Sequence, residues 1–221
     1  MTDNLEITVK TAGEGERTVL VLHGGSGPDG VAGLVEHLAQ TARVLAPTHP
    51  GWDDTPRPDW FTGVDSLAIT YLDLLADAGH TDVTVIGSSF GGWVTAEMAV
   101  RDRGGQLGRL ILLDGIGPDI PGYPIRPPAQ RPGMPDLNPL TPYTGTDYAD
   151  PKLLRRLAKV TNPVQLIWGE DDQVAPVGFG KIYAAAFPRA RFDVLPGVGH
   201  MPALQAPQAT FALVDEFLSG S

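Results

Sequence analysis

The stretch Val83 to Met98 reads VTVIGSSFGGWVTAEM, and it decides the fold. Residues 83–86 predict a short buried strand, residues 87–91 match the pattern G-x-S-x-G, and residues 92–101 predict a helix. A strand that passes through a sharp turn directly into a helix is the context in which this pattern presents a nucleophilic serine. The alternative for these five residues alone is a Gly- and Ser-rich turn without chemistry.

Two serines compete for the tip of this turn. The sharp turn requires small residues two positions before and two positions after the tip, because larger side chains would collide there. Ser88 has isoleucine and phenylalanine at those positions, whereas Ser89 has Gly87 and Gly91. Ser89 is therefore the candidate nucleophile.

Composition narrows the class of protein. The chain has 221 residues and a net charge of −10, and it is expected to form one domain over residues 1–221. The net negative charge argues against nucleic acid or an anionic membrane as a partner, since both require a basic patch. We therefore expect the partner to be a small-molecule substrate. The absence of cysteine excludes disulfides and thiolate chemistry. The sequence shows neither a leader pattern nor a long apolar run, so we expect a cytoplasmic protein.

Apolar runs alternate with segments of helical periodicity along the chain. This alternation predicts βαβ units and a parallel sheet covered by helices on both faces. Strands are expected at 5–11, 18–22, 44–46, 83–86, 110–113, 163–168 and 191–195, and helices at 28–40, 64–78, 92–101, 152–159, 177–187 and 202–219.

One segment, residues 115–150, breaks this alternation. It has no sustained periodicity, and nine prolines fall between Pro118 and Pro142. We interpret it as a compact insertion with at most a single helical turn. A long connecting loop and a working lid are both open interpretations.

The candidate chemistry lies at the carboxyl ends of the strands, where the reactive groups of open α/β sheets gather. A serine hydroxyl is a weak nucleophile, so it needs a base that is itself oriented by a carboxylate. His200, in the loop after the last strand, is the predicted base. The acid is expected in the run Gly169-Glu170-Asp171-Asp172, with Asp172 preferred, Asp171 as the alternative and Asp114 as a third candidate.

Four motifs in this order resemble the α/β-hydrolase superfamily over essentially the whole chain: HGG at 23–25, GSSFGG at 87–92, WGEDDQVAP at 168–176 and GVGHMP at 197–202. The resemblance implies an α/β-hydrolase fold with a mostly parallel sheet of about seven strands and helices on both faces. It also implies an oxyanion hole formed by the backbone N–H groups of Gly25 and Phe90, and no metal or cofactor.

Two departures from the family are visible. Most members begin with a β-hairpin, whereas here a single strand precedes the HGG strand. The family's helical cap is reduced here to the Pro-rich segment 115–150, which removes the element that usually identifies the substrate.

The resulting prediction is a serine hydrolase that cleaves a small to medium, apolar carboxylic ester through an acyl-enzyme on Ser89. The alternatives are a C–C bond-cleaving or lyase-type tailoring enzyme on the same triad and, less favoured because the triad is complete, a ligand-binding protein. The residues expected to line the substrate pocket are Ser26, His49, Trp52, Trp60, Phe61, Tyr123, Tyr143 and Met201.

Overall fold

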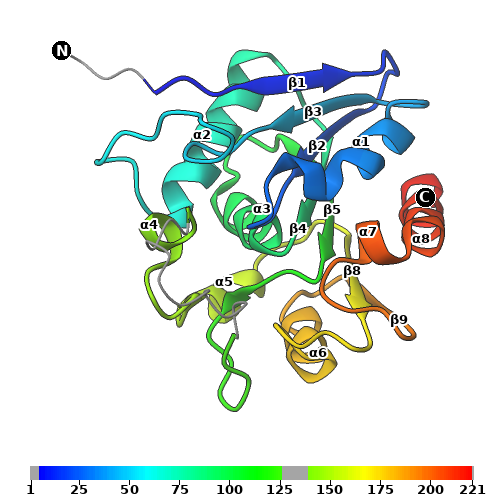
Figure 1. Ribbon diagram of the computed structural model, residues 1–221. Helices are drawn as coiled ribbons and strands as arrows, with labels where there is room; N and C mark the ends of the chain where they lie inside the picture. Colours follow the sequence, from blue (N-terminus) through cyan, green and yellow to red (C-terminus); the bar gives the residue numbers. More distant parts are fainter. Residues whose placement is uncertain (1–4, 126–138, 221) are drawn as a thin grey trace.

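A seven-stranded sheet runs through the computed structural model, which describes residues 5–125 and 139–220 (Figure 1). The strand order is β1-β3-β2-β4-β5-β8-β9, and every neighbouring pair is parallel except β1 with β3. The predicted mostly parallel sheet of about seven strands is thereby confirmed. Its strands are β1 (Val9–Ala12), β2 (Thr18–Leu22), β3 (Arg43–Pro47), β4 (Val83–Ser88), β5 (Leu107–Leu113), β8 (Val164–Gly169) and β9 (Ala190–Leu195).

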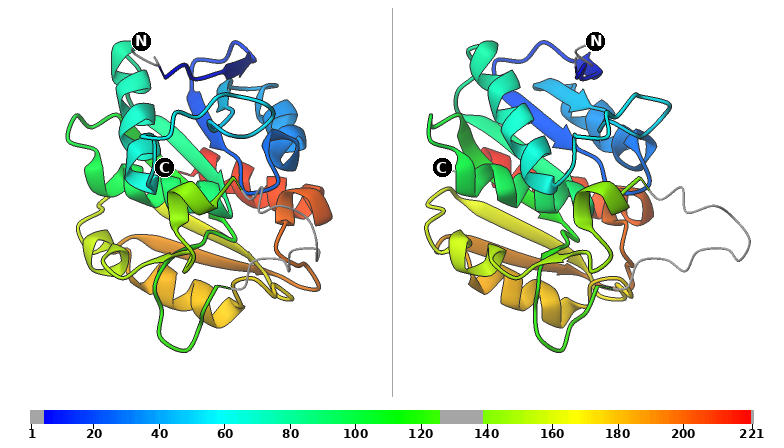
Figure 2. Two further views of the ribbon diagram at one scale, coloured as in Figure 1. Left: turned by 60° about the vertical axis from the view of Figure 1, so that its left-hand side comes forward. Right: turned by 90° about the vertical axis from the view of Figure 1, so that its left-hand side faces the viewer.

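Helices cover both faces of this sheet (Figures 1 and 2). One face packs against α2 (Val64–Asp77), α3 (Phe90–Arg101), α5 (Leu153–Leu157) and α6 (Val177–Ala185), and the opposite face against α1 (Ala32–Leu38), α7 (Pro202–Gln205) and α8 (Pro207–Ser219). Successive strand residues point to opposite faces. In β2, Leu20 and Leu22 join the first core, while Val19 and Val21 join the second. Burial on both sides explains why the inner strands are continuous apolar runs.

Several elements differ from their predicted extents. The first strand begins at Val9 rather than at residue 5. The helix expected over 28–40 is a 3-10 turn, Pro28–Val31, followed by α1. The helix expected over 202–219 is divided at Ala206, which has φ −140° and ψ 60°. Pro207 causes this break, because its ring removes an N–H donor and disfavours the helical conformation of the residue before it.

The insertion at 115–150 is described up to residue 125 and again from residue 139. Its two ends meet in a small parallel pair, β6 (Gly117–Pro118) with β7 (Ala149–Asp150). Between them, α4 (Thr141–Thr144) is a single helical turn. The pairing closes the base of the insertion beside the main sheet.

A buried ion cluster fastens this base to the helix that follows Ser89. Glu97 of α3 is buried, and its carboxylate lies 2.6 Å from Nη2 of Arg156 in α5. Arg101 contacts the same carboxylate, and Arg156 also pairs with Asp150 at the end of β7. Two cations therefore compensate the buried charge of Glu97, which would otherwise be costly.

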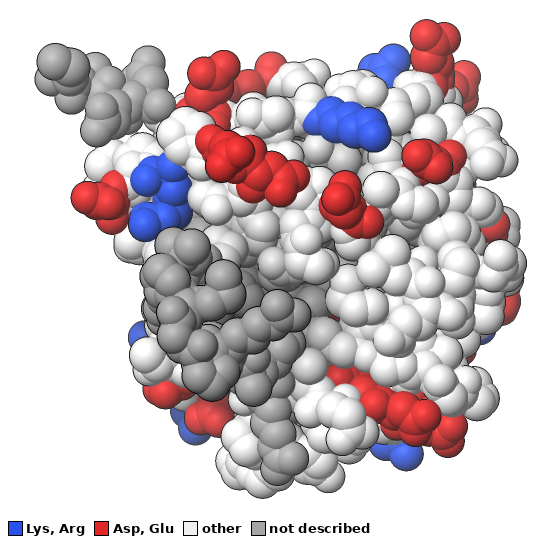
Figure 3. Space-filling view, in the orientation of Figure 1, with Lys and Arg blue, Asp and Glu red and all other residues white. Residues whose placement is uncertain are grey.

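The surface agrees with the acidic composition. Figure 3 shows acidic side chains at several places on one face, with isolated lysine and arginine side chains between them. Among the described residues, no helix combines the length and the apolar character needed to cross a membrane.

Backbone segments approach each other closely around residues 87–91. A methyl group added at Gly87 would lie 2.1 Å from the carbonyl oxygen of Gly91, and one added at Gly91 would lie 2.2 Å from the carbonyl oxygen of Leu22. The turn, α3 and β2 therefore pack backbone against backbone. Glycine is required at both positions because rigid main chain, rather than a flexible side chain, occupies the space.

Gly91→Ala should lower the free energy of unfolding by about 1–3 kcal/mol, since the methyl group has no room. Gly33→Ala is the matched control: it lies inside α1, and its nearest neighbour would be Phe211 Cζ at 3.9 Å. That variant should gain about 0.5–1 kcal/mol, because alanine favours a helix. Urea denaturation of both variants is the measurement. Equal stability of Gly91→Ala and the wild type would contradict the close packing.

Candidate active site

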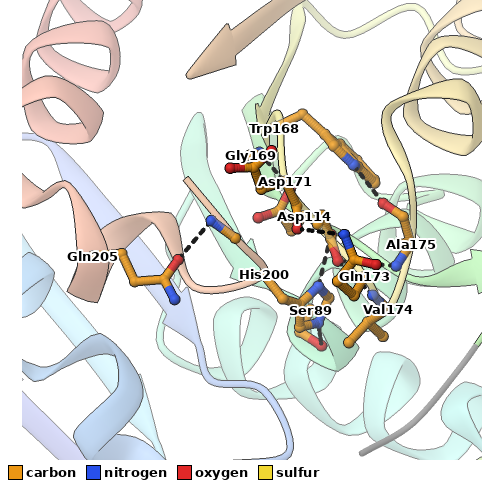
Figure 4. A network of polar contacts seen from close by, with 12 residues as sticks. Ser89, Asp114, Trp168, Gly169, Asp171, Gln173, Val174, Ala175, His200 and Gln205 are labelled. Atoms are coloured by element: carbon orange, nitrogen blue, oxygen red, sulfur yellow. Dashed lines mark hydrogen bonds and ion pairs between the residues drawn. The ribbon is translucent and has the colours of Figure 1, made fainter. Parts of the chain in front are cut away.

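Ser89 occupies the tip of the turn between β4 and α3, with φ 52° and ψ −113° (Figure 4). A serine rarely adopts a positive φ, and such strain persists only where surrounding contacts impose it. The contacts here are backbone hydrogen bonds: the Ser89 N–H donates to Leu113 O at 2.8 Å, and Ser89 O accepts from Gly92 at 3.0 Å and Ile116 at 3.1 Å. The turn is thus held by the neighbouring strand β5 and by its own helix.

His200 connects Ser89 to Asp172 (Figure 4). Its Nε2 lies 2.8 Å from Ser89 Oγ, and its Nδ1 lies 2.8 Å from Asp172 Oδ2. An ionised carboxylate can only accept, so Nδ1 carries the proton, and Nε2 is free to accept the serine O–H. The three residues chosen from the sequence are brought together in the order that proton transfer from the serine requires.

Asp172 is fixed by the loop that follows β8. The residue is 2% exposed, and its Oδ1 accepts hydrogen bonds from the N–H groups of Val174 at 2.7 Å and Ala175 at 3.0 Å. Asp171, the alternative, is exposed, and its backbone N–H donates to Val198 O at 2.8 Å. Asp172 rather than Asp171 therefore carries the carboxylate that His200 meets.

Several supporting residues were not identified from the sequence. The Gly199 N–H donates to Gln205 Oε1 at 2.8 Å, which ties the His200 loop to α7. The indole of Trp168 donates to Ala175 O at 2.7 Å and braces the loop around Asp172. Trp168, Ala175 and Gly199 stand within the quoted motifs, but these contacts could not be predicted because they depend on how two separate loops fold back at the sheet edge.

Gly25 and Phe90, the predicted oxyanion donors, lie in the loop after β2 and at the start of α3. Phe90 is the first residue of α3, so its N–H has no acceptor within the helix. The loop after β2 lies against the serine: a methyl group on Gly24 would be 3.0 Å from Ser89 Cβ. The indole of Trp52 donates to Gly25 O at 3.0 Å, which orients that peptide group.

His49 was predicted to contact substrate, and the structure contradicts this. The side chain is 0% exposed; its Nε2 donates to His23 O at 3.0 Å, and its Nδ1 accepts from the Tyr71 hydroxyl at 2.5 Å. His23 in turn accepts from the His49 N–H at 3.0 Å and donates from Nδ1 to Gly24 O at 2.8 Å. Burial lowers the pKa of His23 to about 4, and burial together with His23 lowers the pKa of His49. Both imidazoles are neutral braces beneath the glycine loop.

The predicted aromatic lining divides into a buried base and a solvent-exposed residue. Trp52 stacks against both Phe90 and Tyr143, with ring centroids 5.8 Å and 5.9 Å away, and Phe90 and Tyr143 also contact each other at 5.8 Å. Tyr143, from α4, donates to Pro50 O at 2.7 Å, and Phe61 packs edge-on against it. Trp52 and Tyr143 pack against Phe90, the residue that follows Ser89. Trp60 is 63% exposed, so it extends into solvent instead of lining a pocket.

The remaining lining candidates lie at two places around the site. Ser26 and Met201 approach each other: a methyl group on Gly30 would be 2.4 Å from Ser26 Oγ and 3.2 Å from Met201 Cε. Tyr123, from the insertion, packs against Gly178 at the start of α6. Leu140 covers the loop that contains Gly25, because its Cδ1 lies 3.0 Å from a methyl group placed on Gly25.

One cluster has the composition of a metal site. Asp114, Asp172 and His200 present ligand atoms within 4.8 Å of one another. However, Asp172 already accepts from Val174, Ala175 and His200, and both nitrogens of His200 have partners. A cation would have to displace these hydrogen bonds, so the donor set suits a proton relay better than a metal.

Known proteins share this architecture. The model of the alpha/beta hydrolase family matches residues 19–213. A 67-residue segment is 34% identical to monoacylglycerol lipase ABHD6 of Rattus norvegicus, and it covers 30% of this chain but only 20% of that protein. Over 97% of this chain and 92% of the relative, the sequence is 23% identical to a 2-hydroxy-6-oxononadienedioate/2-hydroxy-6-oxononatrienedioate hydrolase of Pseudomonas putida.

A solved structure supports the same assignment of fold. The crystal structure of a bacterial membrane phospholipase A superposes with a TM-score of 0.82 at 23% identity, covering 99% of this chain and 84% of that one. The family model spans most of the chain, from the HGG strand to the final helix. The chain is therefore a member of the alpha/beta hydrolase family.

Proposed function

We propose that this chain is a serine hydrolase that cleaves a small to medium, apolar carboxylic ester. The single observation that carries the proposal is the hydrogen-bonded series Ser89, His200 and Asp172, with both bonds at 2.8 Å and the serine in a strained conformation. A serine with only a structural role would need neither the hydrogen bond to His200 nor the strained backbone. Without the Ser89 hydroxyl, Nε2 of His200 would also have no partner among the described residues.

The reaction would proceed in two steps. Ser89 Oγ attacks the ester carbonyl while His200 Nε2 takes its proton and then delivers it to the leaving alcohol. His200 next activates a water that attacks the acyl-enzyme and releases the acid. Asp172 keeps the His200 proton on Nδ1 throughout. The N–H groups of Gly25 and Phe90 stabilise the developing oxyanion, and each such donor typically contributes about 3–4 kcal/mol.

The side chains near the site favour an apolar substrate. Leu140 covers the Gly25 loop, and Met201 Cε lies close to Gly30 on the other side. The alignment with the Pseudomonas putida hydrolase extends over 264 positions, which exceeds the 221 residues of this chain. That relative therefore has additional residues within the aligned region, as expected if the insertion at 115–150 is a reduced cap over a relatively open site.

A second candidate is hydrolysis of a C–C bond or lyase-type chemistry on the same triad. The observation that favours it is the similarity, along nearly the whole chain, to the hydrolase of 2-hydroxy-6-oxononadienedioate. Both candidates use the same three side chains, and the shape of the substrate pocket separates them.

Ser89→Ala should fold like the wild type and lose roughly 10³ to 10⁶ in turnover, because the nucleophile is gone while the scaffold is intact. The measurement is hydrolysis of a p-nitrophenyl ester chain-length series, together with peptide mapping after fluorophosphonate treatment. We expect stoichiometric labelling of Ser89 in the wild type and faster turnover of short and medium acyl chains than of long ones.

Ser88→Ala is the matched control, because Ser88 is the adjacent serine, is buried at the end of β4, and plays no part in the proposed reaction. Its labelling and turnover should match the wild type. Full esterase activity in Ser89→Ala would remove Ser89 from the mechanism. A folded wild type that is neither labelled nor active on esters would favour the C–C or lyase candidate.

Asp172→Asn should lower kcat by about 10⁴, because an amide can donate to Nδ1 and so favours the wrong tautomer of His200. Asp171→Asn removes an exposed carboxylate one residue earlier and should leave kcat near the wild-type value. Steady-state kinetics of the two variants side by side test the assignment. A larger loss in Asp171→Asn would transfer the role to Asp171.

A further inference from the structure

A second carboxyl group lies behind Asp172, and the reaction proposed above does not use it. Asp114 follows β5, is 0% exposed, and has φ 44°, which turns the chain sharply at the end of the strand. Its Oδ1 accepts a hydrogen bond from the Gly169 N–H at 2.9 Å. Its Oδ2 is buried and has no hydrogen-bond partner among the described residues. A buried oxygen in this state requires an explanation.

Among the described residues, the titratable side chains grouped with Asp114 are those of Asp172, from the loop after β8, and His200, from the loop after β9. Ligand atoms of the three lie within 4.8 Å of one another. Within the described part of the chain, neither lysine nor arginine forms an ion pair with Asp114. Two ionised carboxylates, buried and adjacent without a cation, would repel strongly.

The hydrogen bonds indicate which of the two carboxyl groups holds the charge. Asp172 accepts three N–H groups, from Val174, Ala175 and His200, and each of these stabilises the ionised form. Asp114 accepts one, from Gly169. Burial, and then the adjacent charge of Asp172, raise the pKa of Asp114 well above its usual range. A proton on Asp114 also gives its unpartnered oxygen a donor to direct at Asp172.

We propose that Asp114 is a neutral carboxylic acid at neutral pH, that its O–H donates to the Asp172 carboxylate, and that it is a positioning residue for the triad. The proton leaves a single negative charge facing His200 and adds a further donor that fixes the plane of the Asp172 carboxylate. The protonation stands on burial and geometry alone, whereas the positioning role rests on the proposed hydrolase function.

The first experiment tests the proton without any substrate. In Asp114→Asn the amide oxygen accepts from Gly169 and the amide NH₂ replaces the O–H donor, and asparagine tolerates the positive φ. The wild type must take up a proton on folding at any pH above the ordinary aspartate pKa of about 3.9. The stability that the Asp114 proton contributes is therefore fully present below that value and is lost as pH rises toward the folded-state pKa. The variant has no such loss.

The unfolding equilibrium constant of the wild type, divided by that of Asp114→Asn, should rise about tenfold per pH unit between roughly pH 5 and neutral pH. Urea denaturation across this range gives the ratio, and other titrating groups cancel because both proteins share them. The exposed Asp171→Asn is the control and should give a flat ratio. A flat ratio for Asp114→Asn would overturn the proposal.

A measurement on the wild type alone guards against a variant that fails to fold. The infrared spectrum at neutral pH should contain the carbonyl stretch of a protonated carboxylic acid that shifts in deuterium oxide. A spectrum containing only ionised carboxylate bands would overturn the proposal.

The positioning role is tested by comparing Asp114→Asn with Asp114→Ala on the p-nitrophenyl ester that the wild type cleaves. Alanine removes the donor and leaves the Gly169 N–H unpartnered, so kcat should fall about 10- to 100-fold with little change in KM. Asparagine should restore most of that loss and keep the acidic limb of the pH profile of kcat/KM in place. A shifted limb, or a loss as large as that of alanine, would overturn the role. If the wild type cleaves no ester, the proposed function fails, while the stability ratio still decides the protonation.

Discussion

The site depends on a serine held in a backbone conformation that a serine alone would avoid. A residue with positive φ costs about 1–3 kcal/mol, which must come from its surroundings. At Ser89 this energy comes from the hydrogen bond to Leu113 of the neighbouring strand and from the close backbone packing that Gly87 and Gly91 allow. The same close approach brings the loop after β2 to the serine. The strain and the assembly of the site thus have one origin.

Two buried polar clusters flank the serine, and burial acts on them in opposite ways. Beneath the glycine loop, His23 and His49 are kept uncharged, because every ring nitrogen has a neutral partner and water is excluded. Around Asp172, three N–H groups donate to a buried carboxylate. Burial therefore keeps the histidine pair uncharged, whereas the Asp172 carboxylate is surrounded by hydrogen-bond donors.

The sequence indicated the proposed nucleophile and base more clearly than the proposed acid or the pocket. Ser89 follows from glycine spacing, which is a local requirement. The choice between Asp171 and Asp172 depends on backbone donors of residues 174 and 175, and these become visible only once the loop has folded. His49 was wrongly placed in the pocket, because a position in a Pro-rich loop does not reveal burial. The helix break before Pro207 could have been predicted from the conformational restrictions of proline. The apolar residues on both sides follow helical periodicity, so the sequence analysis predicted one continuous helix.

The paired strands β6 and β7, fastened through Arg156 to α3, have a consequence for how this family can diversify. The insertion leaves and rejoins the domain at one closed base, so its length can change between the two paired strands. Closing a longer loop on such a base costs little, about 0.6 kcal/mol for each doubling of its length. The paired strands β6 and β7 are therefore the point at which a longer insertion would add the least entropic cost to the fold.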